Sequence, residues 1–378
     1  MAESLHCYVH IPFCLRKCPY CDFVSYAGRE HLIESYVGAV VTEAQAVAAS
    51  LPGRKLATAY LGGGTPSLLP VGEVERVLGA LDRAWGIAAG AEVTLEANPG
   101  TVDEAKLAEL RRLGINRLSL GVQSLDDGAL AALGRLHTAQ EAVAAYHMAR
   151  DGGFDNVCLD LMYALPEQTA ASWRLQLQKA IELDPEHVSA YGLTIENGTE
   201  FWRRAAAGEL ALPDEDEQLD MYGAARAMLG AAGYRQYEIS NWARAGRECR
   251  HNQAYWRGEE YVGLGAAAHS LVRGTRRSNV EDVEVYIAAV ESAEAPTASE
   301  ESLSGRRGLG EAIMLGLRTV EGVDLEAAQQ RFGVDAWAEH ADSIRELEKL
   351  ALLSRTERGI RLTERGMVLA DEVAMRFL

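Results

Sequence analysis

The sequence predicts an α/β protein in which a partial (β/α)6-type barrel is followed by a small C-terminal winged-helix-like α+β domain. Short β-rich runs alternate with longer segments whose apolar residues recur at helical spacing. Glycine-rich or polar motifs follow several of these runs, and the last part of the chain is typical of three helices and a hairpin. Strands are expected at residues 6–11, 57–61, 92–97, 117–122, 156–162 and 188–195, with a further one at 237–240.

The order of these elements favours a parallel sheet with right-handed crossovers, because helices are expected between the strands. Periodicity alone does not separate a barrel from an open doubly wound sheet. The barrel is favoured because unusual residues end successive strands, which suits a site at the carboxyl-terminal face of a barrel. The helices are expected at 36–49, 71–85, 104–113 and 172–183. The unusual residues are Gly62 to Pro66 after the second strand, Glu96 to Pro99 after the third, Gln123 and Ser124 after the fourth, and Asp160 in the fifth.

The C-terminal part of the chain has a pattern of its own. Residues 291–305 are rich in Ser, Ala and Glu and contain Pro296, which predicts a linker. Residues 306–378 hold 11 basic and 13 acidic side chains, so a packing module is favoured over a DNA-binding one. Helices are expected there at 309–318, 325–331 and 336–350, then strands at 353–356 and 359–363, then a last helix. The predicted domains are the barrel at 1–240, an extension at 241–291, a linker at 292–305 and the C-terminal domain at 306–378.

Composition excludes some classes of function. The chain has 378 residues, 48% of them hydrophobic, and a formal net charge of −18. Such an acidic chain does not favour a broad nucleic-acid surface, which needs clustered Lys and Arg. The sequence has neither a signal-peptide pattern nor an apolar run long enough to span a membrane. We therefore expect a cytoplasmic protein that binds no nucleic acid, and peripheral contact with a membrane stays open.

Three of the six cysteines, Cys14, Cys18 and Cys21, fall within eight residues. In a large cytosolic chain such a cluster predicts metal or redox chemistry before disulfides. Thiolates are suitable ligands for iron–sulfur clusters and for zinc. A four-iron cluster normally takes four cysteines, and three would leave one iron open to another molecule. The alternative is a structural zinc site in which His10 is the fourth ligand.

The run Cys14-x3-Cys18-x-Tyr20-Cys21 resembles the signature of the radical SAM superfamily, whose members use S-adenosyl-L-methionine (SAM). The segment 8–13 just before it is similar to the oxygen-independent coproporphyrinogen III oxidase-like branch, and the resemblance extends over nearly the whole chain. It implies a 4Fe–4S cluster on the three cysteines, with SAM on the open iron. A reduced cluster would then cleave SAM. Whether a substrate is turned over stays open, and no catalytic side chain is assigned beyond the cluster.

The same resemblance implies a SAM site at the strand ends. The turn Gly63-Gly64-Thr65 would contact the methionine amine, since glycine lets backbone groups approach a ligand closely. For Tyr8 and Tyr20 the alternative is a place among the core aromatics. The family usually has glycine where this chain has Ala164 and Glu167, so that loop is expected to differ locally. The implied residues are Tyr8, Tyr20, Gly63, Gly64, Thr65, Glu96, Gln123, Arg135 and Asp160.

A later motif, His251-Asn252-x-x-Tyr255-Trp256, resembles the mark of the haem-chaperone branch of the superfamily. It implies that the protein binds haem and delivers it to haem proteins, including respiratory ones, with a reductant such as flavodoxin or ferredoxin as another partner. His251 could ligate the haem iron, and Tyr255 and Trp256 could cover the porphyrin. The alternative is a structural loop in which His251 is hydrogen-bonded within the core.

Two kinds of radical enzyme are also consistent with the resemblance to the superfamily. One is an oxygen-independent coproporphyrinogen III dehydrogenase, and the second is a class C methyltransferase that uses two SAM molecules on a small aromatic substrate. The dehydrogenase family carries one more cysteine two positions after the triad, where this chain has Phe23. This departure argues against the dehydrogenase, and the motif at 251–256 favours the chaperone over both enzymes.

Overall fold

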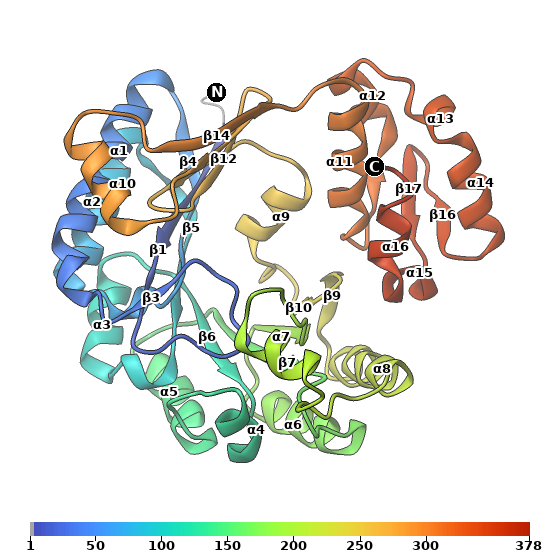
Figure 1. The fold of residues 1–378 in the computed structure, drawn as a ribbon, viewed down its shortest axis with the longest axis horizontal. Helices are drawn as coiled ribbons and strands as arrows, with labels where there is room; N and C mark the ends of the chain where they lie inside the picture. Colours follow the sequence, from blue (N-terminus) through green and yellow to red (C-terminus); the bar gives the residue numbers. More distant parts are fainter. Residues whose placement is uncertain (1–3) are drawn as a thin grey trace.

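The computed structural model describes residues 4–378. Its centre is a set of six strands that lie side by side in chain order, each parallel to the next (Figure 1). A doubly wound sheet would instead reverse its strand order at a switch point. The partial barrel expected from the sequence is thus confirmed. The six strands are β1 (Ser4–Ile11), β4 (Lys55–Gly63), β5 (Ile87–Ala97), β6 (Arg117–Gln123), β7 (Val157–Tyr163) and β8 (His187–Gly192).

Helices follow these strands and cover the outer face of the barrel. In α2, for example, Val74, Val77, Leu78 and Leu81 recur at helical spacing and are buried. Local signals set the helix starts, as at the capping box of Thr138 and Glu141 before α5. The longer helices are α1 (Ile33–Ser50), α2 (Val71–Trp85), α3 (Glu104–Arg112), α5 (Ala139–Asp151), α6 (Ala170–Glu182) and α8 (Glu215–Ala231). The short elements are β2 (Phe13–Cys14), β3 (Tyr26–Ala27), η1 (Glu30–Leu32), η2 (Pro66–Leu68), η3 (Pro99–Thr101), α4 (Asp127–Ala132) and α7 (Glu200–Ala206).

Both ends of the barrel sheet are extended, so that twelve strands form one sheet within residues 4–378. At one end β11 runs parallel to β1, and three antiparallel strands follow. At the other end the antiparallel pair β10 and β9 continues from β8, so the strand expected at 237–240 lies slightly earlier. The added strands are β9 (Arg235–Glu238), β10 (Asn241–Ala243), β11 (Tyr261–Leu264), β12 (His269–Val272), β13 (Thr275–Asn279) and β14 (Thr297–Ser302).

The predicted linker is wrong for residues 297–302, which form the edge strand β14. This strand is mostly exposed and has no apolar face, so the sequence shows no strand pattern there. Ion pairs across the register hold it to β13 instead: Glu301 faces Arg276, and Glu300 accepts from Arg277 at 2.7 Å. Just before it, α10 (Val283–Glu291) packs against α1.

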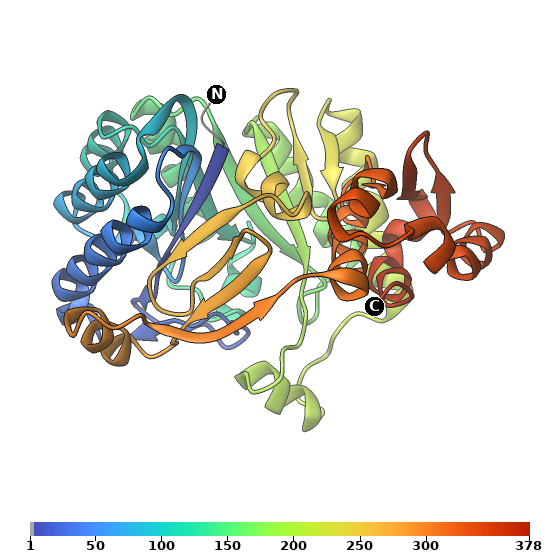
Figure 2. The same cartoon turned by 90° about the horizontal axis from the view of Figure 1, so that it is seen from above.

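The C-terminal domain has a separate hydrophobic core around Leu309, Ile313, Ile344 and Ile360. A small antiparallel sheet and several helices surround this core (Figure 2). The helix expected at 336–350 is in fact two helices separated at His340. The elements are α11 (Gly305–Leu317), β15 (Val323–Asp324), α12 (Leu325–Phe332), α13 (Ala336–Glu339), α14 (Ala341–Lys349), β16 (Leu353–Arg355), β17 (Gly359–Leu362), α15 (Glu364–Val368) and α16 (Ala370–Ala374).

The domain is docked on the barrel beside α9 (Arg250–Trp256), which contacts α11 (Figure 1). Arg318 pairs with the buried Glu238 at 3.5 Å, and the amide of Val320 donates to the carbonyl of Tyr237 at 3.2 Å. None of the helices within residues 4–378 is both long and apolar enough to cross a membrane.

Candidate cofactor site

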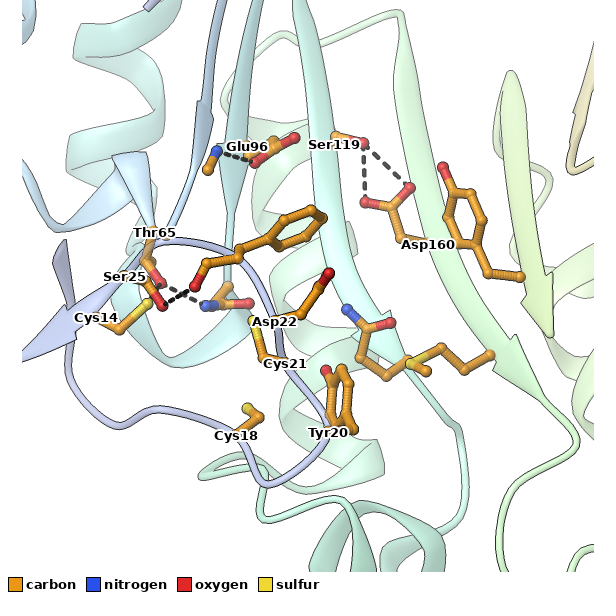
Figure 3. Close-up of a pocket in the computed structure, with 18 of the residues that line it drawn as sticks. Cys14, Cys18, Tyr20, Cys21, Asp22, Ser25, Thr65, Glu96, Ser119 and Asp160 are labelled. Carbon is orange, nitrogen blue, oxygen red and sulfur yellow. Dashed lines mark hydrogen bonds between the residues drawn. The ribbon is translucent and has the colours of Figure 1, made fainter. Parts of the chain in front are cut away.

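A cavity of about 460 Å³, here called the cofactor cavity, opens at the carboxyl ends of the barrel strands. The loop that carries the cysteines covers one side of it, and Glu96 and Asp160 extend from β5 and β7 on the other side (Figure 3). The structure brings most of the residues named from the sequence to this cavity: Cys14, Cys18, Tyr20, Cys21, Gly63, Gly64, Thr65, Glu96, Gln123, Arg135 and Asp160.

Two of the three cluster thiols accept hydrogen bonds from the cavity wall. Thr65 Oγ1 donates to Cys14 Sγ at 3.5 Å, and Arg135 Nη1 donates to Cys18 Sγ at 3.7 Å. Burial raises the pKa of the Cys21 thiol to about 11, so this thiol needs a metal to become a thiolate at neutral pH. The other cysteines, Cys7, Cys158 and Cys249, are buried and do not line the cavity.

The zinc alternative needs a free His10 as its fourth ligand. His10 is engaged elsewhere, because its Nε2 lies 2.8 Å from the carbonyl of Val24 and its Nδ1 lies 3.0 Å from the Tyr8 hydroxyl. An iron–sulfur cluster does not need this histidine, because its ligands are thiolates.

The glycine turn is fixed against the segment that precedes the cysteines. Gly63 has φ +111°, a conformation that favours glycine, and a side chain there would collide with the His10 ring. The amides of Gly64 and Thr65 donate to the carbonyls of Ile11 and Phe13, both at 2.8 Å. These contacts hold the floor of the cavity close to the first cysteine.

Four carboxyl groups line the cavity, and two of them, those of Glu96 and Asp160, extend from barrel strands. Glu96 accepts from the Tyr60 hydroxyl at 2.8 Å and from the Gly63 amide at 2.9 Å. Burial raises its pKa to about 7, against the opposing effect of these hydrogen bonds. Asp160 accepts from Ser119 Oγ at 2.9 Å, and burial raises its pKa as well. A cationic ligand in the cavity would favour the charged form of both carboxyls, against the effect of burial.

Arg135 is not a solvated surface arginine. Its Nη2 donates to the carbonyl of Gly121 at 2.7 Å and to Asn98 Oδ1, while Asn98 Nδ2 donates to Thr65 Oγ1 at 2.9 Å. Asn98 thus links the two side chains that contact Cys14 and Cys18.

Sequence reasoning assigned no role to several residues of this cavity. Asn98 belongs to a motif at the end of a strand. Its contacts with Thr65 and Arg135 could not be predicted, because both partners are distant in the sequence. Arg117 is 2% exposed and lines the cavity together with Ser119 and Tyr60. The sequence holds one signal for Arg117, which is a charged residue at the start of an otherwise apolar strand.

The loop with Ala164 and Glu167 keeps the glycine-like backbone. Both residues have positive φ, 59° and 62°, although neither is glycine. The amide of Glu167 donates to the carbonyl of Ala211 at 2.8 Å, which helps to hold this conformation. The local difference expected from the sequence is therefore limited to the residue type, because both positions keep a positive φ.

Four residues named from the sequence lie elsewhere. Tyr8, Tyr255 and Trp256 line a second cavity of about 520 Å³, between the barrel and the C-terminal domain. His251, which its motif gave as a possible haem ligand, lines neither cavity in the observed conformation. Its Nδ1 lies 2.6 Å from Thr58 Oγ1, its Nε2 lies 3.0 Å from the Tyr255 hydroxyl, and only 1% of the residue is exposed. In this conformation His251 is a hydrogen-bonded core histidine, as in the alternative interpretation of its motif.

Comparisons with known proteins agree with this fold. The Radical SAM superfamily model matches residues 8–175, and the HemN C-terminal domain model matches residues 303–369. The heme chaperone HemW of Bacillus subtilis is 34% identical over 98% of both chains. The heme chaperone HemW of Escherichia coli is 42% identical over 71% of this chain and 70% of its own. The solved coproporphyrinogen III oxidase HemN of Escherichia coli, a radical SAM enzyme, has 25% identity and a TM-score of 0.86 over 100% of this chain and 90% of its own.

Proposed function

The chain belongs to the radical SAM superfamily and, within it, to the family of the heme chaperone HemW, and from this premise we propose that it binds a 4Fe–4S cluster, SAM and haem and delivers haem to haem proteins. The observation that carries the proposal is the similarity to a HemW protein over 98% of the chain. The three thiols around the cofactor cavity support it, because a chaperone of this superfamily would use the same cofactors.

Cys14, Cys18 and Cys21 would hold the cluster and leave one iron for SAM, to which a reduced cluster supplies an electron. Hydrogen bonds from Thr65 and Arg135 to two of the sulfurs offset negative charge there. Residues that orient the first ligands in this way hold the site in one geometry.

The other wall of the cavity would bind SAM. SAM carries a sulfonium and an ammonium group, and Glu96 and Asp160 can face positive charge or accept from hydroxyl groups. Gln123 and Tyr20 line the same cavity and can close it against water. We propose these residues, with Gly63, Gly64 and Arg135, as the SAM site.

The recipients would be haem proteins, including respiratory ones, and the reductant would be a flavodoxin or ferredoxin. The cytoplasm is the proposed location. Peripheral membrane contact would bring the chain to membrane-bound recipients.

An anaerobic haem titration of the cluster-loaded protein tests the proposal, followed by mixing with a haem-free acceptor protein. Saturable binding and transfer faster than from free haem are expected. Without saturable binding the chaperone proposal fails. The alternative would then be an oxygen-independent coproporphyrinogen III dehydrogenase, which the structural match to HemN favours. Product analysis with coproporphyrinogen would test that alternative.

A further inference from the structure

The second cavity is built from parts of the chain that are far apart in sequence. β1 contributes Tyr8, α9 contributes Tyr255 and Trp256, and α11 of the C-terminal domain contributes Met314 and Leu315. The remaining walls come from residues 22–24 after the cysteines and from β11 and β12. Its volume of about 520 Å³ is within the range of small-molecule and cofactor sites.

The lining is suited to a flat, largely apolar ligand. Phe23, Tyr255, Trp256 and Tyr261 bring aromatic surface, and Leu271 adds aliphatic surface. The indole Nε1 of Trp256 is buried, and no hydrogen-bond partner for it exists within residues 4–378. A buried donor without a partner in the chain carries a cost in stability.

Three histidines lie at or near this cavity, and two of them are already engaged. His10 is held by Tyr8 and the Val24 carbonyl, and His251 by Thr58 and Tyr255. His269, on β12, lines the cavity and is exposed. In the part of the chain that is described, its ring makes no hydrogen bond. His269 therefore has an imidazole nitrogen available for a metal.

Resting on the proposed function, we propose that haem occupies the second cavity and that His269 ligates its iron. An imidazole nitrogen is a common ligand of haem iron, and aromatic side chains can cover the porphyrin. Arg276 also lines the cavity, but it is paired with Glu311 at 2.7 Å and with Glu301. The haem carboxylates would therefore point to the open side of the cavity, away from these two glutamates.

This position places haem next to the cofactor cavity. Asp22 and Phe23 line both cavities, so the loop after Cys21 forms the wall between them. Haem and SAM would bind at the same time, on opposite sides of this loop.

The test is an anaerobic haem titration of the cluster-loaded full chain, followed by absorbance and electron paramagnetic resonance. We expect His269→Ala to weaken haem binding by roughly tenfold or more and to change the ligand signature of the iron. Added imidazole should restore that signature in the variant. The matched control is His147→Ala, an exposed histidine on α5 that lines neither cavity and should leave binding unchanged.

A second variant tests the cavity without touching the iron ligand. Met314→Trp narrows the cavity from the C-terminal domain and should weaken haem binding while SAM binding stays unchanged. Haem binding with an unaltered signature in His269→Ala would overturn the assignment and leave the chaperone proposal standing. Displacement of haem by excess SAM would also overturn it, because haem would then occupy the cofactor cavity. Absence of any saturable haem binding in the unmodified chain would overturn both.

Discussion

Arg135 Nη1 lies 3.7 Å from Cys18 Sγ, and the same guanidinium reaches the carbonyl of Gly121 at 2.7 Å. The arginine is thus fixed by the end of β6 while it contacts a thiol of the cysteine loop. This contact connects the barrel to the cluster loop and makes Cys18 the best first target.

Cys18→Ser should remove most of the iron, the sulfide and the brown absorbance of anaerobically reconstituted protein, because a hydroxyl is a poor replacement for a soft thiolate. Iron and sulfide analysis measures this. Cys7→Ala is the matched control, since Cys7 is fully buried and lines neither cavity. Full iron content in Cys18→Ser would contradict the cluster assignment.

Asp160→Ala should weaken SAM binding by about tenfold, because the cavity loses a carboxyl that accepts from Ser119 and is open to a ligand. Isothermal calorimetry on the cluster-loaded protein measures the affinity. Asp155→Ala is the control, because its side chain is 67% exposed and pairs only with Arg247 at 3.4 Å among the residues that the structure describes. An unchanged affinity in Asp160→Ala would remove Asp160 from the SAM site.

SAM binding should depend on pH through Glu96, whose pKa is raised to about 7 by burial. The charged carboxylate binds a cationic ligand and the neutral acid does not, so binding requires loss of a proton below this pKa. Affinity should therefore rise by about tenfold per pH unit up to about 7 and then level off. Glu96→Gln should bind SAM more weakly and without this dependence. If the SAM affinity of Glu96→Gln rises with pH as it does in the unmodified chain, the titrating group is not Glu96.

The barrel could be predicted because its strands and helices follow a periodic pattern of apolar residues, and this pattern is visible in short stretches of the sequence. β14 could not be, because exposed charges hold it to β13 and leave no apolar face. In the site, the cysteines and the glycine turn are adjacent in sequence and form recognisable motifs. The roles of Asn98 and His251 depend on partners far away in the chain, Arg135 and Thr58, which only the folded structure brings near.

Gly63→Ala should destabilise the protein by about 2 kcal/mol or more, since alanine is strained at φ +111° and its methyl group would meet the His10 ring. Chemical denaturation of the cluster-free protein measures the free energy of unfolding. Gly72→Ala is a matched control near the start of α2, where a methyl group meets nothing within 4 Å. Equal stability of the two variants would contradict the strained turn.

His251→Ala separates a structural role from haem ligation. The substitution removes the His251 partner of the Tyr255 hydroxyl and one of the two partners of Thr58 Oγ1, which keeps His6 Nδ1 at 2.9 Å. It also opens space beside Tyr60, whose ring centroid lies 5.1 Å from that of His251. We expect a loss of about 2 to 4 kcal/mol in the free energy of unfolding. The iron ligand signature of bound haem should persist at a temperature where the variant is folded, because the ring does not reach the second cavity. Loss of that signature in a folded variant would instead assign the iron to His251.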